Sequence, residues 1–224
     1  MNEQMYNRLR AVGEHAAAQC FKELHGQIQY LEGPQLSSMI ITLPETGAQV
    51  TVSLYRSPSD RDWKDCYDCA FETVGLVTAK APSSDWKHRI LNARHSPIRE
   101  LLYKFRFDGI PYDVAMHLRT HSAGVNPYIR SQRNDRQSNY NRHKAPQDAP
   151  VSMRWTLNAE ALMNVCNKRE CELASIDTST VVRAMALLAE QATPEFKGLL
   201  VPMCEYHGGI CREMKPCGKY PYVE

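Results

Sequence analysis

The sequence predicts an α/β (α+β) protein, because stretches with the spacing of strands and stretches with the spacing of helices share one chain. Residues 38–43 and 48–55 are rich in Ile, Val, Thr and Leu and are separated by a Pro-Glu-Thr-Gly turn, which indicates a β-hairpin. Large apolar residues occupy every second position of residues 101–107, as in a strand with one buried face. Apolar residues recur every three or four positions over residues 1–32 and 177–192, as in amphipathic helices.

The boundaries of these elements follow from local signals. The helix over residues 1–32 ends at Gly33-Pro34, and Asp177-Thr178 suits the N-cap of the helix over residues 177–192. Asp108-Gly109 is expected to end the central strand, and the polar residues 134–150 are expected to form a loop. Further helices are expected at residues 60–77, 86–94, 111–121 and 158–171.

Composition limits the class of protein. The chain has 224 residues, of which 43% are apolar and 23% charged, so it can bury a sizeable core like an ordinary globular protein. The formal net charge of +2 implies no strong overall attraction to nucleic acid, and anion binding must come from local patches. No apolar run reaches the roughly 18 residues of a membrane span, and the N-terminus lacks the apolar core of a signal peptide. We therefore expect a cytoplasmic protein whose eight cysteines are mostly reduced thiols.

A basic stretch begins at the end of the helix expected at residues 111–121. Its six basic residues, against the single acid Asp135, are Arg119, Arg130, Arg133, Arg136, Arg142 and Lys144. Arginine presents N–H donors that fit phosphate bidentately, Ser131 and Asn126 add short polar groups, and Gly124 lets the backbone approach a ligand closely. The stretch indicates an anion-binding loop, and the alternative is a solvated basic loop.

Several residues are of types that bind metal ions. Asp113, His117 and His121 share one face of the expected helix, which is either a ligand spacing or a polar face turned to a cavity or to solvent. Near the C-terminus, the candidates for a structural zinc ion are Cys204, His207, Cys211 and Cys217. Their spacing matches no standard zinc ribbon, and the alternative is free thiols in a loosely ordered tail. A lone C-x-x-C pair, Cys66 and Cys69, could replace some of them, and no metal site is predicted.

Two separated segments together resemble the flavin-dependent thymidylate synthases, the ThyX family. The family signature of R-H-R, a spacer and S-x-R is similar to Arg119-Thr120-His121 followed by Ser131-Gln132-Arg133. The family pattern W-T-x-N-A-x-x-L-M-N-x-x-N-x-R matches residues 155–169, and His95-Ser96-Pro97 stands where the family has a His- and Ser/Thr-containing turn. The resemblance covers roughly residues 48–200 and divides the chain into three parts. These are an N-terminal extension at 1–47, a ThyX-like catalytic domain at 48–200 and a Cys-rich tail at 201–224.

The resemblance implies a ThyX-like fold, with a central, mostly antiparallel sheet flanked by helices and an extra N-terminal helix. It implies a homotetramer whose active sites are built from several subunits. It also implies reductive methylation of dUMP to dTMP, in which NADPH reduces a bound FAD and methylenetetrahydrofolate provides the one-carbon unit for C5 of dUMP.

By position, the resemblance also implies roles for individual residues. Ser131 and Arg169 are implied in catalysis. The residues implied to hold dUMP and its phosphate are Ser131, Gln132, Arg133 and Arg169. The residues implied to contact FAD are His95, Ser96, Arg119, His121, Asn126, Asn158 and Asn164. These types suit the ligands, because arginine forks and hydroxyls bind phosphate and amides can hydrogen-bond a flavin or base edge.

The chain departs from the family patterns at several positions. The departures are Thr120 for His, His121 for Arg, Pro127 for Glu and Glu160 for Arg. They leave open a related C5 modification of another pyrimidine nucleotide, such as hydroxymethylation, and a catalytically silent nucleotide-binding or scaffold protein. A nucleic-acid-binding module is disfavoured, because the basic patch is confined to one loop and has only Tyr128 and Tyr140 as aromatic neighbours.

Overall fold

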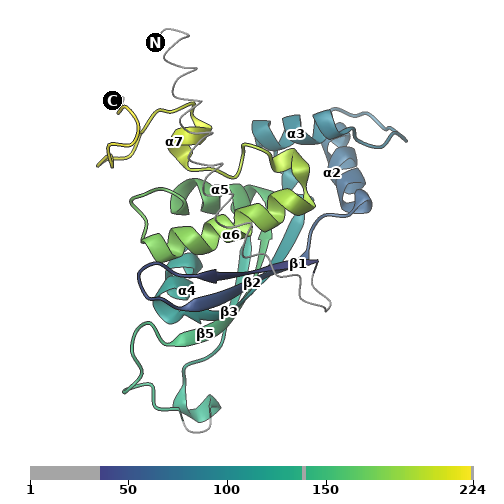
Figure 1. Cartoon of the computed structure of the whole chain (residues 1–224). Coiled ribbons are helices and arrows are strands. Elements are labelled where there is room, and N and C mark those ends of the chain that lie inside the picture. Colours follow the sequence, from purple (N-terminus) through teal and green to yellow (C-terminus); the bar gives the residue numbers. More distant parts are fainter. Residues whose placement is uncertain (1–35, 138–139, 223–224) are drawn as a thin grey trace.

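The computed structural model describes residues 36–137 and 140–222, which form one five-stranded antiparallel sheet with helices packed on it (Figure 1). The strands are β1 (Ser37–Thr42), β2 (Gln49–Arg56), β3 (Leu102–Pro111), β4 (Val125–Ile129) and β5 (Pro150–Asn158). They lie side by side in the order β1-β2-β3-β5-β4, and each neighbouring pair is antiparallel. The helix predicted over residues 1–32 lies outside the described residues.

The helices of the described residues follow the sequence expectations in type, except α7, which was not predicted. They are α2 (Asp60–Glu72), α3 (Ser84–Ala93), α4 (Tyr112–Arg119), α5 (Ala159–Arg169), α6 (Ile176–Ala192) and α7 (Met203–Tyr206). The short 3-10 segments are η1 (Ser96–Glu100), η2 (Asn134–Arg136) and η3 (Pro194–Phe196). The prediction that the second helix extends to residue 77 was wrong, because α2 ends at Glu72. No helix among these is long and apolar enough to cross a lipid bilayer.

One face of the sheet carries the core. Helices α5 and α6 lie across this face, α6 over β1 and β2 and α5 over β3 and β5 (Figure 1). Tyr103, Phe105 and Phe107 of β3 are buried beneath the helices, while Lys104 between them is exposed on the other face. The central strand therefore has the single buried face that its alternation predicts.

The predicted hairpin is confirmed, and a helix anchors its turn. Strands β1 and β2 pair in register from Ser37↔Leu54 to Thr42↔Gln49. The buried Asp177 carboxylate of α6 accepts hydrogen bonds from the backbone N–H of Glu45 at 2.8 Å and of Thr46 at 3.1 Å, and from the Thr46 hydroxyl at 2.8 Å. The N-cap predicted at Asp177-Thr178 was misplaced. The cap of α6 is Ser175, whose side chain accepts from the N–H of Thr178.

Strand β3 is longer than predicted. It does not end at Asp108-Gly109 but continues to Pro111, with a β-bulge between Asp108 and Ile110. Gly109 has φ +80°, and a Cβ there would stand 2.7 Å from the carbonyl oxygen of Gln49. Glycine thus bends the strand without ending it, because it alone fits the positive φ and the close backbone approach.

Two strands lie where the sequence predicted loop or the approach to a helix. In β5, Val151, Met153, Trp155 and Leu157 alternate as buried residues, so Trp155 belongs to a strand. Strand β4 lies within the basic stretch and contains Pro127. It is an edge strand, where a residue without an N–H donor is tolerated. Because β4 pairs with β5, the two motif segments become neighbours in space.

The Asp177 contacts give a testable stability difference. Replacing Asp177 by Ala removes the acceptor of three hydrogen bonds, and we expect the free energy of unfolding to fall by about 2–3 kcal/mol. Urea unfolding followed by tryptophan fluorescence measures this change. Asp148→Ala, at an exposed loop position, is the control and should change the free energy of unfolding by less than about 0.5 kcal/mol. Equal effects of the two substitutions would contradict the anchoring role.

Candidate functional site

The guanidinium group of Arg169 is the centre of a side-chain cluster that joins α5 to the end of α4. Its Nε donates to Nε2 of His121 at 2.9 Å, and its Nη2 donates to the Thr120 hydroxyl at 2.9 Å. Its Nη1 contacts Nε2 of His117. We call Arg169, His117, Thr120 and His121 the Arg169 cluster. The Trp155 ring of β5 lies beside it, 6.5 Å from the His121 ring.

The strand order explains why these side chains meet. Helix α4 follows β3 directly and α5 follows β5 directly. Because β3 and β5 are antiparallel neighbours, the two helices start at opposite ends of the sheet. Their C-terminal turns meet, as the contacts of Arg169 show. Antiparallel pairing thus unites residues that lie 48 positions apart in the sequence.

The Arg169 cluster fixes the protonation of its histidines. A guanidinium group only donates, so the Nε2 atoms of His117 and His121 must be unprotonated acceptors. Nδ1 of His117 then donates to the buried Thr178 hydroxyl at 3.1 Å. Burial, followed by the nearby Arg169 charge, lowers the pKa of His121 to about 4, and the same two causes lower the pKa of His117. Both rings are therefore neutral near pH 7.

Arg169 differs from Arg133 in its partners. Arg133 pairs with Asp135, through Nε to Oδ1 at 2.8 Å and Nη2 to Oδ2 at 2.6 Å. Among the described residues, Arg169 has no carboxylate partner and is held only by neutral acceptors. It is half-buried, and burial lowers the pKa of its guanidinium. A half-buried positive charge without a counter-ion favours the binding of an anion.

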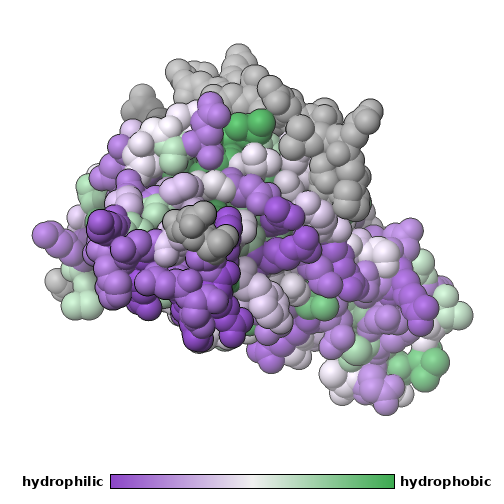
Figure 2. Space-filling model, turned by 90° about the horizontal axis from the view of Figure 1, so that it is seen from below, coloured by the Kyte–Doolittle hydropathy of each residue, from purple (hydrophilic) through white to green (hydrophobic). Residues whose placement is uncertain are grey.

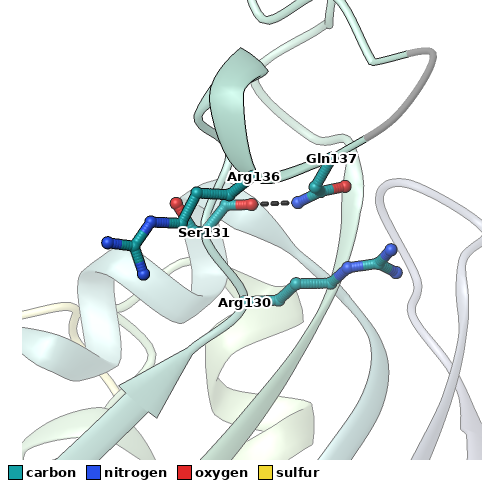
Figure 3. Close-up of a pocket in the computed structure, with 4 residues that line it drawn as sticks. All are labelled: Arg130, Ser131, Arg136 and Gln137. Atoms are coloured by element: carbon teal, nitrogen blue, oxygen red, sulfur yellow. Dashed lines mark hydrogen bonds between the residues drawn. The ribbon is translucent and has the colours of Figure 1, made fainter.

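A second polar site lies in the loop between β4 and β5. Arg130, Ser131, Arg136 and Gln137 line a hollow of about 360 Å³. The Gln137 amide donates to the carbonyl oxygen of Ser131, and the guanidinium groups of Arg130 and Arg136 point to opposite sides of this bond (Figure 3). Hydrophilic residues gather over this loop on the lower face of the molecule (Figure 2). The loop offers donors to an anion, but its arginines do not converge on one point.

Two buried donor atoms near these sites lack acceptors. The Nε2 atom of Gln132 and the Nε1 atom of Trp155 are buried without a hydrogen-bond partner among the described residues. Buried donors are almost always satisfied in folded proteins. Gln132 directly follows Ser131, and Trp155 lies beside His121. Trp155 is a core residue, so its donor faces the interior, whereas Gln132 is half-buried beside Ser131 and lies closer to the surface.

The residues expected to contact FAD are not all brought together. Asn158 caps α5, because its side chain accepts from the N–H of Ala161 at 2.8 Å. It also packs on Gly124, where a Cβ would stand 2.6 Å from its amide nitrogen. Asn164 accepts from Nη1 of Arg94 at 2.8 Å. His121 belongs to the Arg169 cluster. The exposed members of the set are Asn164, His95, Ser96, Arg119 and Asn126.

The charge reversal at Glu160 has a partner that the sequence did not reveal. Arg99 of η1 donates to Glu160 from Nε at 2.7 Å and from Nη2 at 3.3 Å. The pair neutralises the carboxylate at the first turn of α5. The two residues are 61 positions apart, and no motif connects them. Sequence reasoning also missed Thr178 as a partner of His117, since it was expected only as part of a helix cap.

A solved structure shares the architecture. The chain matches the crystal structure of thymidylate synthase X from Helicobacter pylori with FAD and dUMP, with a TM-score of 0.51 and 14% sequence identity. The match covers 66% of this chain and 96% of that chain. The fold is ThyX-like. At this level of identity the likeness concerns the fold alone. No protein-family model and no curated protein sequence matches the chain.

The low pKa of His121 predicts a pH dependence of stability. The imidazole pKa is about 6.5 in the unfolded chain and about 4 in the folded chain. Between these two pH values the unfolded state binds a proton at His121 that the folded state does not bind. The stability that His121 contributes is complete above pH 6.5 and is lost over this window. We expect wild type to lose about 1–2 kcal/mol more than His121→Gln between pH 7 and pH 5, after allowance for solvent screening.

Chemical denaturation at each pH measures this difference. Glutamine keeps an acceptor for Arg169 and does not titrate, so the variant isolates the proton. Parallel pH profiles for wild type and His121→Gln would show that His121 is not held neutral by the Arg169 cluster.

Proposed function

We propose that this chain is a flavin-dependent thymidylate synthase-like enzyme that methylates dUMP reductively, with FAD, NADPH and methylenetetrahydrofolate. The observation that carries the proposal is the Arg169 cluster, in which a half-buried guanidinium is held by neutral acceptors and keeps its charge for an anion. The cluster unites Thr120 and His121 of one motif with Arg169 of the other. The ThyX-like fold, shared with a protein crystallised with FAD and dUMP, supports the assignment.

The nucleotide would be held by Arg169 and by the segment Ser131-Gln132-Arg133. Arg169 uses three of its five N–H groups within its cluster, and two remain for a phosphate. The Ser131 oxygen accepts from the N–H of Arg133 at 3.3 Å, so the hydroxyl proton remains available to a phosphate oxygen. Arg133 would exchange Asp135 for phosphate at small cost, because an exposed ion pair contributes only about 0–1 kcal/mol. The unpaired Gln132 amide would donate to a carbonyl of the pyrimidine.

The remaining residues of the Arg169 cluster orient the arginine. Neutral His117 and His121 add no second positive charge and fix the plane of the guanidinium. Thr178 fixes the His117 ring through Nδ1. Ser131 and Arg169 are the proposed catalytic residues in the sense that they hold the nucleotide in a defined position.

Two features of the described residues would favour flavin binding: exposed polar side chains and a neutralised carboxylate. His95, Ser96, Arg119 and Asn126 are exposed and would contact FAD, together with His121, Asn158 and Asn164. The neutralisation of Glu160 by Arg99 removes a charge that would repel the phosphates of FAD. The flavin, when bound, supplies the hydride chemistry, and the protein's contribution is to position it.

The site is proposed to be completed by other subunits of a homotetramer. The residues proposed to contact FAD do not converge within the described residues of one chain, and neighbouring subunits would contribute the remaining contacts. The seven cysteines of the described residues are free thiols, which suits a cytoplasmic location.

The first test is flavin and nucleotide binding by the full chain. After incubation with FAD and gel filtration, we expect flavin absorbance to remain with the protein. Replacing Arg169 by Ala should weaken dUMP binding about 10- to 100-fold, which is about 1.5–3 kcal/mol, the size of a charge-assisted hydrogen bond. Isothermal titration with dUMP measures this loss.

Arg89→Ala is the matched control, because this exposed arginine of α3 pairs only with Asp85 among the described residues and lies outside the motifs. Its dUMP affinity should equal that of wild type. Equal losses in both variants would indicate a general effect of charge and would contradict the assignment of Arg169.

The Arg99–Glu160 pair gives a second prediction, for FAD alone. Replacing Arg99 by Ala leaves the Glu160 carboxylate uncompensated, and we expect FAD affinity to fall about 3- to 10-fold while dUMP affinity stays unchanged. The double variant Arg99→Ala/Glu160→Gln should restore the FAD affinity. Fluorescence titration of FAD measures both, and a double variant as weak as the single one would show that the charge of Glu160 is not the cause.

Product analysis separates the related chemistries. The altered signature positions Thr120, His121 and Pro127 keep a related C5 modification open as a second candidate. Mass spectrometry of the reaction with dUMP distinguishes a methyl from a hydroxymethyl product. Nucleotide binding without retained flavin would instead favour the catalytically silent binder.

A further inference from the structure

Four cysteines line one small hollow at the C-terminal end of the molecule. The hollow, of about 70 Å³, lies between the end of α5, helix α7 and the tail that follows it. Its cysteines are Cys171, Cys204, Cys211 and Cys217, all of them free thiols. Of the seven cysteines in the described residues, these four share one site although Cys171 is far from the others in sequence. The fold therefore gathers soft-ligand side chains that come from three separate segments.

Contacts that do not involve sulfur hold these segments together. Lys168 at the end of α5 pairs with Glu213 of the tail at 3.0 Å. Lys219 of the tail reaches Glu172 at 3.3 Å and Glu205 of α7 at 3.4 Å. The convergence of the four cysteines is thus maintained from both ends of the tail.

Packing alone does not explain this set. Cys211 is buried, as a cysteine that serves as a small apolar residue would be, but Cys217 is exposed and Cys171 and Cys204 are half-buried. Three of the four thiols are thus at least partly exposed, which leaves them accessible to a metal ion from solvent.

We propose that Cys171, Cys204, Cys211 and Cys217 bind one Zn²⁺ ion as a structural four-cysteine site. Four thiolates in tetrahedral geometry are the ligand set of structural zinc. On binding, four S–H groups release their protons to solvent and four Zn–S bonds form, with no change in oxidation state. Cys171 takes the place of His207, which belonged to the set expected from the sequence but does not line the hollow.

Zinc binding requires the sulfur atoms to move closer together. In the present arrangement, no three His, Cys, Asp or Glu side chains of the described residues surround a point where they could hold a metal ion. Rotation about the single side-chain torsion χ1 moves each sulfur among three staggered positions. Between His207 and Tyr222 the tail contains one isolated β-bridge, Cys211↔Tyr222, and no helix or strand that would resist adjustment.

The zinc ion would connect the tail to the candidate nucleotide site. Cys171 follows Arg169 by two residues, so a metal bound there fixes the chain directly beyond the end of α5. This inference does not depend on the proposed enzyme activity, since a structural metal would be required equally in a silent homologue.

The test is titration of Co²⁺ into the full chain, reduced and kept free of oxygen. We expect one equivalent of Co²⁺ to give the visible absorption bands of tetrahedral cobalt–thiolate coordination, and Zn²⁺ to abolish them by competition. Cys171→Ser and Cys217→Ser should each weaken Co²⁺ binding at least about 100-fold, because losing a ligand costs more than losing an outer-shell hydrogen bond, itself worth about 10- to 100-fold. Cys69→Ser, at an exposed position of α2, is the control and should bind like wild type.

A thiol count keeps the proposal testable if a serine variant fails to fold. In the folded wild-type chain, one equivalent of Zn²⁺ should protect Cys171, Cys204 and Cys217 from an alkylating reagent, and a chelator should restore their modification. The buried Cys66 and Cys166 should resist the reagent in both states. The proposal is overturned by absence of cobalt–thiolate bands in wild type, by loss of the bands in Cys69→Ser, or by equal alkylation with and without zinc. A disulfide among these four cysteines in protein purified under reducing conditions would overturn it as well.

Discussion

The contacts of the Arg169 guanidinium connect most of the functional elements of this protein. Arg169 ends α5 and binds His117, Thr120 and His121 at the end of α4. Through His117 and Thr178 the network continues to the first turn of α6, where Asp177 holds the turn between β1 and β2. Two sets of hydrogen bonds, joined by the peptide bond between Asp177 and Thr178, therefore connect the ends of α4 and α5 and the edge hairpin to the first turn of α6.

The electrostatic consequence is a division between two kinds of arginine. Arg99 and Arg133 form ion pairs with Glu160 and Asp135, and these pairs are exposed enough to exchange partners at low cost. Arg169 has only neutral acceptors among the described residues, and its geometry is fixed before any ligand arrives. The fixed guanidinium of Arg169 can orient a bound anion, whereas an exposed loop arginine such as Arg133 can change its contacts with a ligand. A small anionic ligand that must be held in one position requires the first kind.

The sequence predicted the elements whose signals lie within a few neighbouring residues, and it missed those that depend on contacts between distant segments. The hairpin, the alternation of β3 and the helices were predicted because their apolar spacing lies within a few residues. Strand β5 was missed although its buried residues alternate, since Trp155-Thr156 was interpreted as the approach to α5. Strand β4 was missed because Pro127 and the surrounding arginines have a loop composition, and only pairing with β5 makes it a strand. Motif residues identified Arg169 and His121, but nothing local could connect Arg99 with Glu160.

Three positions at which the sequence departs from the family patterns make defined contacts in the structure. Thr120 and His121, which replace His and Arg, are the acceptors that hold Arg169, and an arginine at position 121 would place a second cation against the first. Glu160 stands where the family pattern has Arg, and its negative charge is neutralised by Arg99 of η1. Thr120, His121 and Glu160 thus each have a partner that restores charge balance or donor–acceptor complementarity, whereas Pro127 is tolerated because β4 is an edge strand. These partners matter for stability, because a half-buried donor such as the Arg169 guanidinium would destabilise the fold if its acceptors were absent.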